Sequence, residues 1–254
     1  MSFSTLRRRM LDGEILAGTF LKTPVPELVE VLAASGLDFI ALDAEHSPID
    51  RARGDACLAI ARALDFPTLV RVPDGTQAEI LKVMDSGALG VVVPHVATPE
   101  KAADIAKWSR FGHGGRGYAG STRWAGFTTR PMADVLKQSA EETIVIGQIE
   151  EPEGVEAIDA ITATEGLDGV FVGPADLAVC LGLSNPAAPE VRAAMEKVAE
   201  AAKRNGCASM TFAPDAASAA EINELGMTMF FIGSDHTMML ATARSVADDL
   251  HALR

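Results

Sequence analysis

The feature that most constrains the fold of this chain is an alternation that repeats eight times. Short apolar runs containing β-branched residues are separated by longer stretches of helical periodicity, the pattern expected of βα units around a parallel sheet. The predicted strands cover residues 17–20, 39–43, 67–72, 90–93, 143–149, 169–172, 207–210 and 229–232. The helices predicted between and after them cover residues 26–34, 49–64, 77–86, 98–107, 154–163, 189–205, 214–225 and 234–253.

Glycines punctuate this alternation just past the ends of five predicted helices. Such a position favours the left-handed backbone conformation that ends a helix and admits glycine. Eight units predict an α/β fold in which a (β/α)₈ TIM barrel closes as a single domain over residues 1–254, in preference to an open doubly wound sheet. No G-x-G-x-x-G motif follows the first strand, which disfavours a dinucleotide-binding fold. The five glycines are Gly36, Gly87, Gly166, Gly206 and Gly226.

Composition narrows the class of partner and the compartment. With 254 residues and 48% hydrophobic residues the chain can bury a large core, and its net charge of -13 repels nucleic-acid phosphates and anionic membranes. Neither a secretory signal nor an apolar run of roughly 18–20 residues is present, so we expect a cytoplasmic protein. Cys57, Cys180 and Cys207 lie in apolar segments and are expected as small core residues, not as a disulfide or zinc framework.

One long segment breaks the regular order. Residues 110–130, RFGHGGRGYAGSTRWAGFTTR, exceed the usual length of a connection at about 20 residues. Such a segment is either an active-site loop or disordered without ligand. Its arginines and aromatic residues favour an active-site loop.

Polar residues gather where the predicted strands end. In a TIM barrel these ends meet at one face, where active sites are built. Each residue alone has a structural explanation as a cap, a turn residue or a hydrogen-bonded side chain. Together they indicate a site. They are Asp43, Glu45 and His46, then Arg71, His95, Gln148, Glu150 and Asp176.

The chemistry of this group favours a hard divalent cation. Two carboxylates from neighbouring strands are oxygen ligands suited to Mg²⁺ or Mn²⁺ and leave coordination positions open. A 2-oxo acid fits those positions, and the cation would polarise its ketone and stabilise the enolate formed on proton loss. Arg71 is expected to hold the developing oxyanion or the carboxylate, and His46, oriented by Asp43, to transfer the proton.

Four motifs in order, DAEHSPID, RVP, GQIEEPEG and GPADLAVCLG, resemble the HpcH/HpaI aldolase family of metal-dependent (class II) pyruvate aldolases. The resemblance runs from about Gly18 to the last helix. It implies Mg²⁺, Mn²⁺ or Co²⁺ held by Glu150 and Asp176, and His46 with Asp43 as the acid/base pair. It also implies Arg71 at the pyruvate oxygen and a pyruvate pocket lined by Gln148, Gly173, Pro174 and Ala175.

The resemblance also implies an assembly. Members form trimers or hexamers in which the last helix is exchanged between neighbours, and an aspartate of the adjacent subunit approaches the site. Asp85, in MDSGALG, matches that aspartate. His95 and the 110–130 segment depart from the family pattern, and both lie where the aldehyde partner is expected to bind.

The function predicted is therefore a carbon–carbon lyase. It would cleave a 4-hydroxy-2-oxo acid, such as a dicarboxylic or sugar acid, to pyruvate and an aldehyde through a metal-stabilised enolate, reversibly, in aromatic-compound or sugar-acid catabolism. Three alternatives stay open: an acyl-CoA lyase of the citrate lyase β subunit type, a noncatalytic 2-oxo acid binder, and a Schiff-base aldolase. The last needs a lysine at a strand end, where Lys22 comes closest, though it reads as a loop lysine.

Overall fold

A computed structural model describes residues 2–253, and within that range eight parallel strands form a closed barrel. Each strand pairs with the next in sequence and β1 closes the barrel against β8. The predicted TIM barrel is confirmed, and each predicted strand overlaps an observed one. The strands are β1 (Leu16–Leu21), β2 (Phe39–Asp43), β3 (Thr68–Arg71), β4 (Gly90–Val93), β5 (Ile144–Ile149), β6 (Gly169–Val172), β7 (Ala208–Ala213) and β8 (Met229–Ser234).

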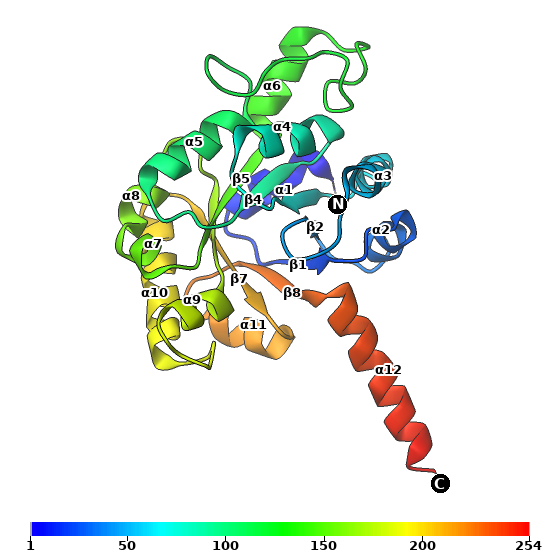
Figure 1. Cartoon of the computed structure of the whole chain (residues 1–254), viewed down its shortest axis with the longest axis vertical. Coiled ribbons are helices and arrows are strands. Elements are labelled where there is room, and N and C mark those ends of the chain that lie inside the picture. The colour runs from blue at the N-terminus through cyan, green and yellow to red at the C-terminus, as the bar shows by residue number, and fades with distance from the viewer. Residues whose placement is uncertain (1, 254) are drawn as a thin grey trace.

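Helices surround the barrel (Figure 1). The five glycines expected to end helices all have positive φ, between 67° and 109°, which confirms that signal. The helices are α1 (Phe3–Leu11), α2 (Pro26–Ala33), α3 (Arg51–Ala63), α4 (Gln77–Ser86), α5 (Pro99–Ser109), α6 (Met132–Glu142), α7 (Pro152–Glu156), α8 (Ile158–Thr162), α9 (Pro174–Cys180), α10 (Pro189–Arg204), α11 (Ala216–Asn223) and α12 (Asp235–His251).

Strand alternation divides the apolar residues into two cores. On β2, Phe39 and Ala41 point into the barrel, while Ile40 and Leu42 belong to the outer core packed under the helices. Glycine is needed where the inner core is tightest, because a Cβ on Gly18 would lie 2.4 Å from the Phe39 ring. The inner core fills the barrel up to the level of the polar site.

Helix α1 was not predicted. Its buried residues Phe3, Leu6 and Met10 join the inner core. Ser2 caps the helix by accepting a hydrogen bond from the Ser4 amide. The helix closes one end of the barrel with these apolar side chains, and its Arg7 pairs there with the buried Asp168 at 2.6 Å.

Segment 110–130 does not lie at the barrel mouth of its own chain. It leaves the end of α5, and it lies on the outer side of the barrel against α3 and α4. Arg116 pairs with Asp85 at 2.6 Å and Arg123 pairs with Asp55 at 2.6 Å. The Trp124 side chain is fully buried in the outer core. The arginines and aromatics that suggested catalysis attach the loop to the scaffold of its own chain.

Two other expectations need correction. One helix was predicted after each strand, but β4 is followed by α5 and α6, β5 by α7 and α8, and β6 by α9 and α10. Cys57 and Cys207 are buried as expected, but Cys180 is exposed at the end of α9. Only Leu177 and Ala178 of this short helix face the core, and helical periodicity turns Cys180 outward together with Val179.

Helix α12 projects away from the barrel (Figure 1). Four of its apolar side chains, Met239, Leu240, Val246 and Leu250, are at least half exposed. No helix within residues 2–253 is both long enough and apolar enough to span a bilayer.

Candidate active site at the barrel mouth

The period of two along each strand explains why polar groups meet at this end. A side chain two residues after an inner-core residue points to the same inward side of the barrel, beyond the apolar layer. Lys22 comes two residues after Phe20. In the same way, Asp43 comes two residues after Ala41 and Arg71 two residues after Leu69. Gln148 likewise follows Ile146 on β5. The carboxyl ends of the strands therefore aim these side chains into one mouth.

Asp43 and Arg71 form the centre of the cluster. They are register partners on β2 and β3. Arg71 Nε donates to Asp43 Oδ1 at 2.9 Å, and Nη2 lies 2.8 Å from Oδ2, a two-point ion pair. Burial alone would raise the pKa of Asp43, but the hydrogen bonds and charge of Arg71, assisted by Lys22, outweigh it and lower the pKa to about 2. Asp43 is held as a carboxylate that fixes the guanidinium.

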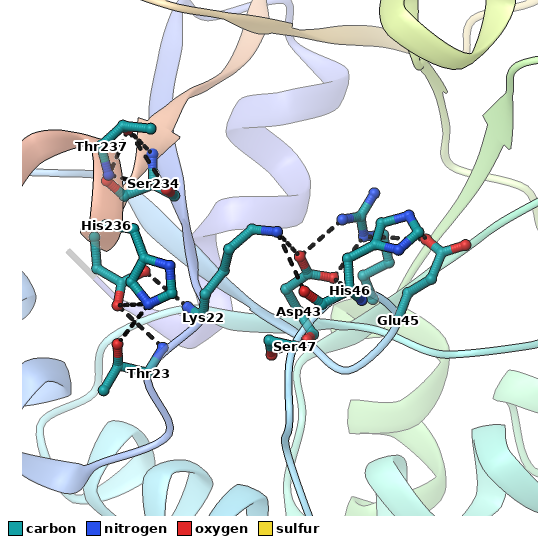
Figure 2. A network of polar contacts seen from close by, with 11 residues as sticks. Lys22, Thr23, Asp43, Glu45, His46, Ser47, Ser234, His236 and Thr237 are labelled. Atoms are coloured by element: carbon teal, nitrogen blue, oxygen red, sulfur yellow. Dashed lines mark hydrogen bonds and ion pairs between the residues drawn. The ribbon is translucent and has the colours of Figure 1, made fainter. Parts of the chain in front are cut away.

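Lys22 belongs to this cluster and is not an ordinary loop lysine. Its Nζ lies 2.9 Å from Asp43 Oδ2 (Figure 2). The ion pair engages the ammonium form, whereas a Schiff base requires the free amine. The position at a strand end suits the Schiff-base alternative, but the pairing with Asp43 does not.

His46 is placed beside the cluster in a way that differs from the expected dyad. Its backbone amide donates to Asp43 Oδ1 at 3.1 Å, and the carboxylate nearest its ring is Glu45, with Nε2 3.6 Å from Oε2. Asp43 thus orients His46 through the loop backbone. The ring is about half exposed at the mouth, where it can meet a substrate.

Glu45 was quoted in the motif but given no role. Its Oε2 lies 3.3 Å from Arg71 Nε without a hydrogen bond to it. Its pKa is raised, chiefly by burial, while Arg71 and His46 act in the opposite direction; the negative charge of Glu150 adds to the increase. Glu45 and Glu150 are therefore close enough for their charges to repel each other.

Glu150 is the carboxylate that most needs an external cation. It is 3% exposed, and within residues 2–253 no lysine or arginine pairs with it. Its Oε1 accepts from the His95 amide at 2.7 Å and lies 3.1 Å from His95 Nδ1, and its Oε2 accepts from Gln148 Nε2. A buried carboxylate without a permanent cation is costly unless a ligand supplies the charge.

Gln148 and Gly173 shape the pocket next to Glu150. Gln148 is buried, and its Oε1 has no hydrogen-bond partner among the described residues. A Cβ on Gly173 would lie 3.4 Å from Glu150 Oε2 and 3.3 Å from Gln148 Nε2, so glycine leaves the carboxylate room. Pro174 and Ala175 begin α9 beside it.

Asp176 stands in the first turn of α9, exposed, one helical turn before Cys180. The pKa of the Cys180 thiol is raised, by desolvation first and then by the charges of Glu151, Asp176 and Glu150. Asp176 and Glu150 are therefore both close enough to Cys180 for their charges to act on it. Within residues 2–253 no three His, Cys, Asp or Glu side chains are already gathered as a complete metal cage.

The donor set fits a hard divalent cation. Carboxylate oxygens from Glu150 and Asp176 match Mg²⁺ or Mn²⁺, which commonly take one or two protein carboxylates and leave the other positions to water and substrate. The lack of a preassembled cage agrees with that mode. The buried, uncompensated Glu150 is the observation that supports the fit.

Asp85 is not brought to this mouth in its own chain. It lies at the end of α4, where Arg116 Nη2 donates to its Oδ1 at 2.6 Å. The expectation concerned the site of an adjacent subunit, so a contribution of Asp85 there remains a prediction.

Comparison with known proteins identifies the family. The sequence profile described as HpcH/HpaI aldolase/citrate lyase matches residues 16–242. The chain belongs to this family. It is 36% identical over 237 residues to the 5-keto-4-deoxy-D-glucarate aldolase of Klebsiella pneumoniae, covering 92% of each chain. It is 31% identical over 255 residues to a hydroxypyruvate/pyruvate aldolase of Paraburkholderia phytofirmans, covering 97% of each.

Solved structures agree with the fold over nearly the whole chain. A family protein of Burkholderia cenocepacia superposes with a TM-score of 0.92 at 33% identity, covering 98% of this chain and 99% of that one. The citrate synthase SbnG superposes with a TM-score of 0.86 at 30% identity, covering 97% and 98%. The family resemblance expected from the four motifs is confirmed, and the chain is an enzyme of the class II aldolase type.

Three members of the site were not assigned from sequence. Glu45 was masked by its neighbours Asp43 and His46. Lys22 was interpreted as a loop lysine, and its pairing with Asp43 is seen only when β1 and β2 lie side by side. Glu151, whose Oε1 lies 3.1 Å from His95 Nδ1, was read only as part of a motif. The inward period of two along β1 would have identified Lys22.

Proposed function

We propose that this HpcH/HpaI protein is a divalent-metal-dependent aldolase that cleaves a 4-hydroxy-2-oxo acid to pyruvate and an aldehyde, reversibly. The observation that carries the proposal is the division of charge at the mouth. Asp43 is neutralised by Arg71 and Lys22, whereas the buried Glu150 has no lysine or arginine partner within residues 2–253. Aldolases acting on 5-keto-4-deoxy-D-glucarate and on pyruvate among its relatives support the reaction class.

The cation, Mg²⁺, Mn²⁺ or Co²⁺, would be held by Glu150 and Asp176. When bound, it supplies a Lewis acid that polarises the 2-oxo group and stabilises the negative charge of the enolate. Gln148 and the segment from Gly173 to Ala175 would form the wall against which the pyruvate part lies. Gln148 Oε1 lies in this wall, buried and without a hydrogen-bond partner among residues 2–253.

Arg71 would bind an oxygen of the 2-oxo acid. Nε and Nη2 are used by Asp43, and Nη1 donates no hydrogen bond within residues 2–253. A guanidinium fixed on two points presents its remaining donors with little loss of conformational freedom. Its plane also rests over the Phe20 ring, 4.4 Å from the ring centroid.

His46 would move the proton. In cleavage, the proton leaves the C4 hydroxyl as the C3–C4 bond breaks. The electrons of the O–H bond form the C4=O double bond of the aldehyde, and the electrons of the C3–C4 bond form the pyruvate enolate. The enolate then takes a proton at C3. The exposed ring beside Glu45 can accept the first proton and return one from the same face, while Asp43 fixes the loop through the His46 amide.

Deuterium exchange tests this function without knowledge of the aldehyde. In D₂O with Mn²⁺, the protein is expected to exchange the methyl protons of pyruvate, as followed by proton NMR. His46→Ala should slow exchange by about 10²-fold or more, the usual contribution of a general base, while Mn²⁺ binding is retained. Undiminished exchange in the variant would remove His46 from its role, and no exchange by the metal-loaded wild type would refute the function.

The acyl-CoA lyase alternative has weaker support. The citrate lyase β subunit of M. tuberculosis has a TM-score of 0.57 at 18% identity, a likeness that extends to the fold alone. The aldolase relatives cover almost the whole chain at twice that identity. The noncatalytic alternative does not account for an exposed histidine held beside an acidic and a basic group.

A homo-oligomer, a trimer or hexamer with α12 exchanged between neighbours, is part of the proposal. Helix α12 projects from the barrel and exposes Met239, Leu240, Val246 and Leu250, which a neighbouring barrel would cover (Figure 1). Sedimentation velocity at micromolar concentration should give a trimer or larger species. Replacing Leu240 and Val246 together by aspartate should shift it toward monomer. A wild-type monomer would contradict the exchange.

A further inference from the structure

His95 contacts the buried Glu150 carboxylate at two points. Its backbone amide donates to Glu150 Oε1 at 2.7 Å, and its ring Nδ1 lies 3.1 Å from the same oxygen. The ring also forms a hydrogen bond with Glu151, where Nδ1 lies 3.1 Å from Oε1. Since a carboxylate can only accept, Nδ1 is the donor in this bond. One residue of the loop after β4 therefore holds two consecutive carboxylates of the loop after β5.

The backbone of His95 has a conformation that residues other than glycine rarely adopt. Its φ is +57°, in the left-handed region. Neighbouring contacts fix this conformation, because Lys101 Nζ donates to the Pro94 carbonyl at 3.0 Å and to the His95 carbonyl at 2.9 Å. The next amide, of Val96, donates to the Gln148 carbonyl on β5 at 3.0 Å. An unfavourable conformation that the surroundings maintain in this way is typical of functional sites.

Both oxygens of Glu150 are held by the protein. Oε1 accepts from the His95 amide, and Oε2 accepts from Gln148 Nε2. Each carboxylate oxygen has about two acceptor positions, so each keeps capacity for a cation. The orientation of this buried carboxylate is thus set by two neighbours, of which His95 belongs to a different strand end.

The ring of His95 contributes little to the packed core. Its side chain is more than half exposed, so little apolar surface is buried with it. The polar contacts of the ring are those to Glu150 and Glu151. Removing the ring should therefore alter the acidic pair without unfolding the barrel.

We infer that His95 is a positioning residue for the metal site and holds the Glu150 carboxylate in the orientation that binds the divalent cation. The inference rests on the proposed function and adds to it a residue that acts through Glu150. Groups that orient a metal ligand typically contribute about 10–100-fold to metal affinity. The competing role is contact with the aldehyde, expected from the sequence at this position, and such a contact would not alter binding of the cation alone.

Mn²⁺ affinity, measured without pyruvate or aldehyde, distinguishes these two roles. Electron paramagnetic resonance follows the free Mn²⁺ during titration of the protein. His95→Ala is expected to weaken binding about tenfold. His95→Asn should stay within about threefold of wild type, because asparagine tolerates a left-handed backbone and its amide nitrogen is as many bonds from Cβ as Nδ1. His113→Ala, which removes an exposed histidine of the long loop, should change binding less than about twofold.

Pyruvate methyl exchange supplies a second readout. For His95→Ala, the Mn²⁺ concentration that gives half the maximal exchange rate should rise about tenfold, while the rate at saturating Mn²⁺ should stay within about threefold of wild type. The melting temperature without metal should be unchanged, because the ring is largely exposed. A residue with a purely structural role would change the melting temperature and not the metal dependence.

Failure of this inference is distinguishable from failure of the proposed function. Equal Mn²⁺ affinity in wild type and His95→Ala would overturn the positioning role, and so would an affinity in His95→Asn as low as in His95→Ala. If Mn²⁺ affinity depends on His95 but wild type does not exchange the methyl protons of pyruvate, the positioning role stands and the aldolase is rejected. A wild type that binds no Mn²⁺ would reject both.

Discussion

Glu150→Gln is expected to abolish most of the activity of this protein, lowering kcat/KM for aldol cleavage by about 10³-fold. The substitution keeps the shape of the side chain and its acceptor for the His95 amide but removes the charge that a divalent cation needs. Lewis-acid stabilisation contributes several kcal/mol, and each 1.36 kcal/mol is a factor of ten in rate. Steady-state kinetics with saturating Mg²⁺, Mn²⁺ and Co²⁺ in turn measure the loss.

The same substitution at Glu156 is the matched control. Glu156 lies on α7, close in sequence but exposed. Glu156→Gln should therefore leave both activity and metal dependence unchanged. If Glu150→Gln kept more than a tenth of wild-type activity, the carboxylate would not be a metal ligand in the reaction.

Arg71→Met is expected to produce the largest loss of stability, about 3–5 kcal/mol in the free energy of unfolding at pH 7. The variant leaves Asp43, which is fully buried, with Lys22 as its remaining cationic partner. Because the pKa of Asp43 is lowered to about 2, its stabilisation is complete above the ordinary value near 3.8 and is lost as the pH falls toward 2. Urea unfolding at pH 7 therefore measures the full effect.

Two further variants distinguish the loss of stability caused by breaking the buried ion pair from the loss caused by removing any arginine. Asp43→Asn/Arg71→Met removes the stranded charge and should recover part of the loss. Arg204→Met breaks an ion pair of 2.6 Å with Asp159 in which both side chains are more than half exposed, and it should leave the urea midpoint unchanged. A similar midpoint for Arg71→Met and Arg204→Met would contradict the role given to Arg71.

The fold could be predicted because its signals are local. β-Branched runs, helical periodicity and glycines with left-handed φ, such as Gly87, each report on a few neighbouring residues. Helix α1 was missed because its apolar residues pack into the open end of the barrel, a contact that only the folded chain shows. The contacts of the long loop could not be predicted, because Arg116 and Arg123 look the same in a sequence whether they bind a substrate or Asp85 and Asp55.

The residues that form the site could be predicted better than the contacts between them. Strand ends identified Asp43, Arg71, Gln148 and Glu150, because parallel strands bring their carboxyl ends together. The partner of each side chain depends on register and loop path. Asp43 accepts a hydrogen bond from the His46 backbone amide and not from its ring, and the sequence alone cannot tell these two contacts apart.

The most direct test is diffraction from a crystal soaked with Mn²⁺ and pyruvate, recorded at a wavelength where manganese scatters anomalously. We expect one anomalous peak per chain at the barrel mouth, bonded to oxygens of Glu150 and Asp176 and to two oxygens of pyruvate, with Arg71 on the same ligand. A mouth without a peak, or a peak elsewhere with pyruvate bound to other residues, would contradict this expectation.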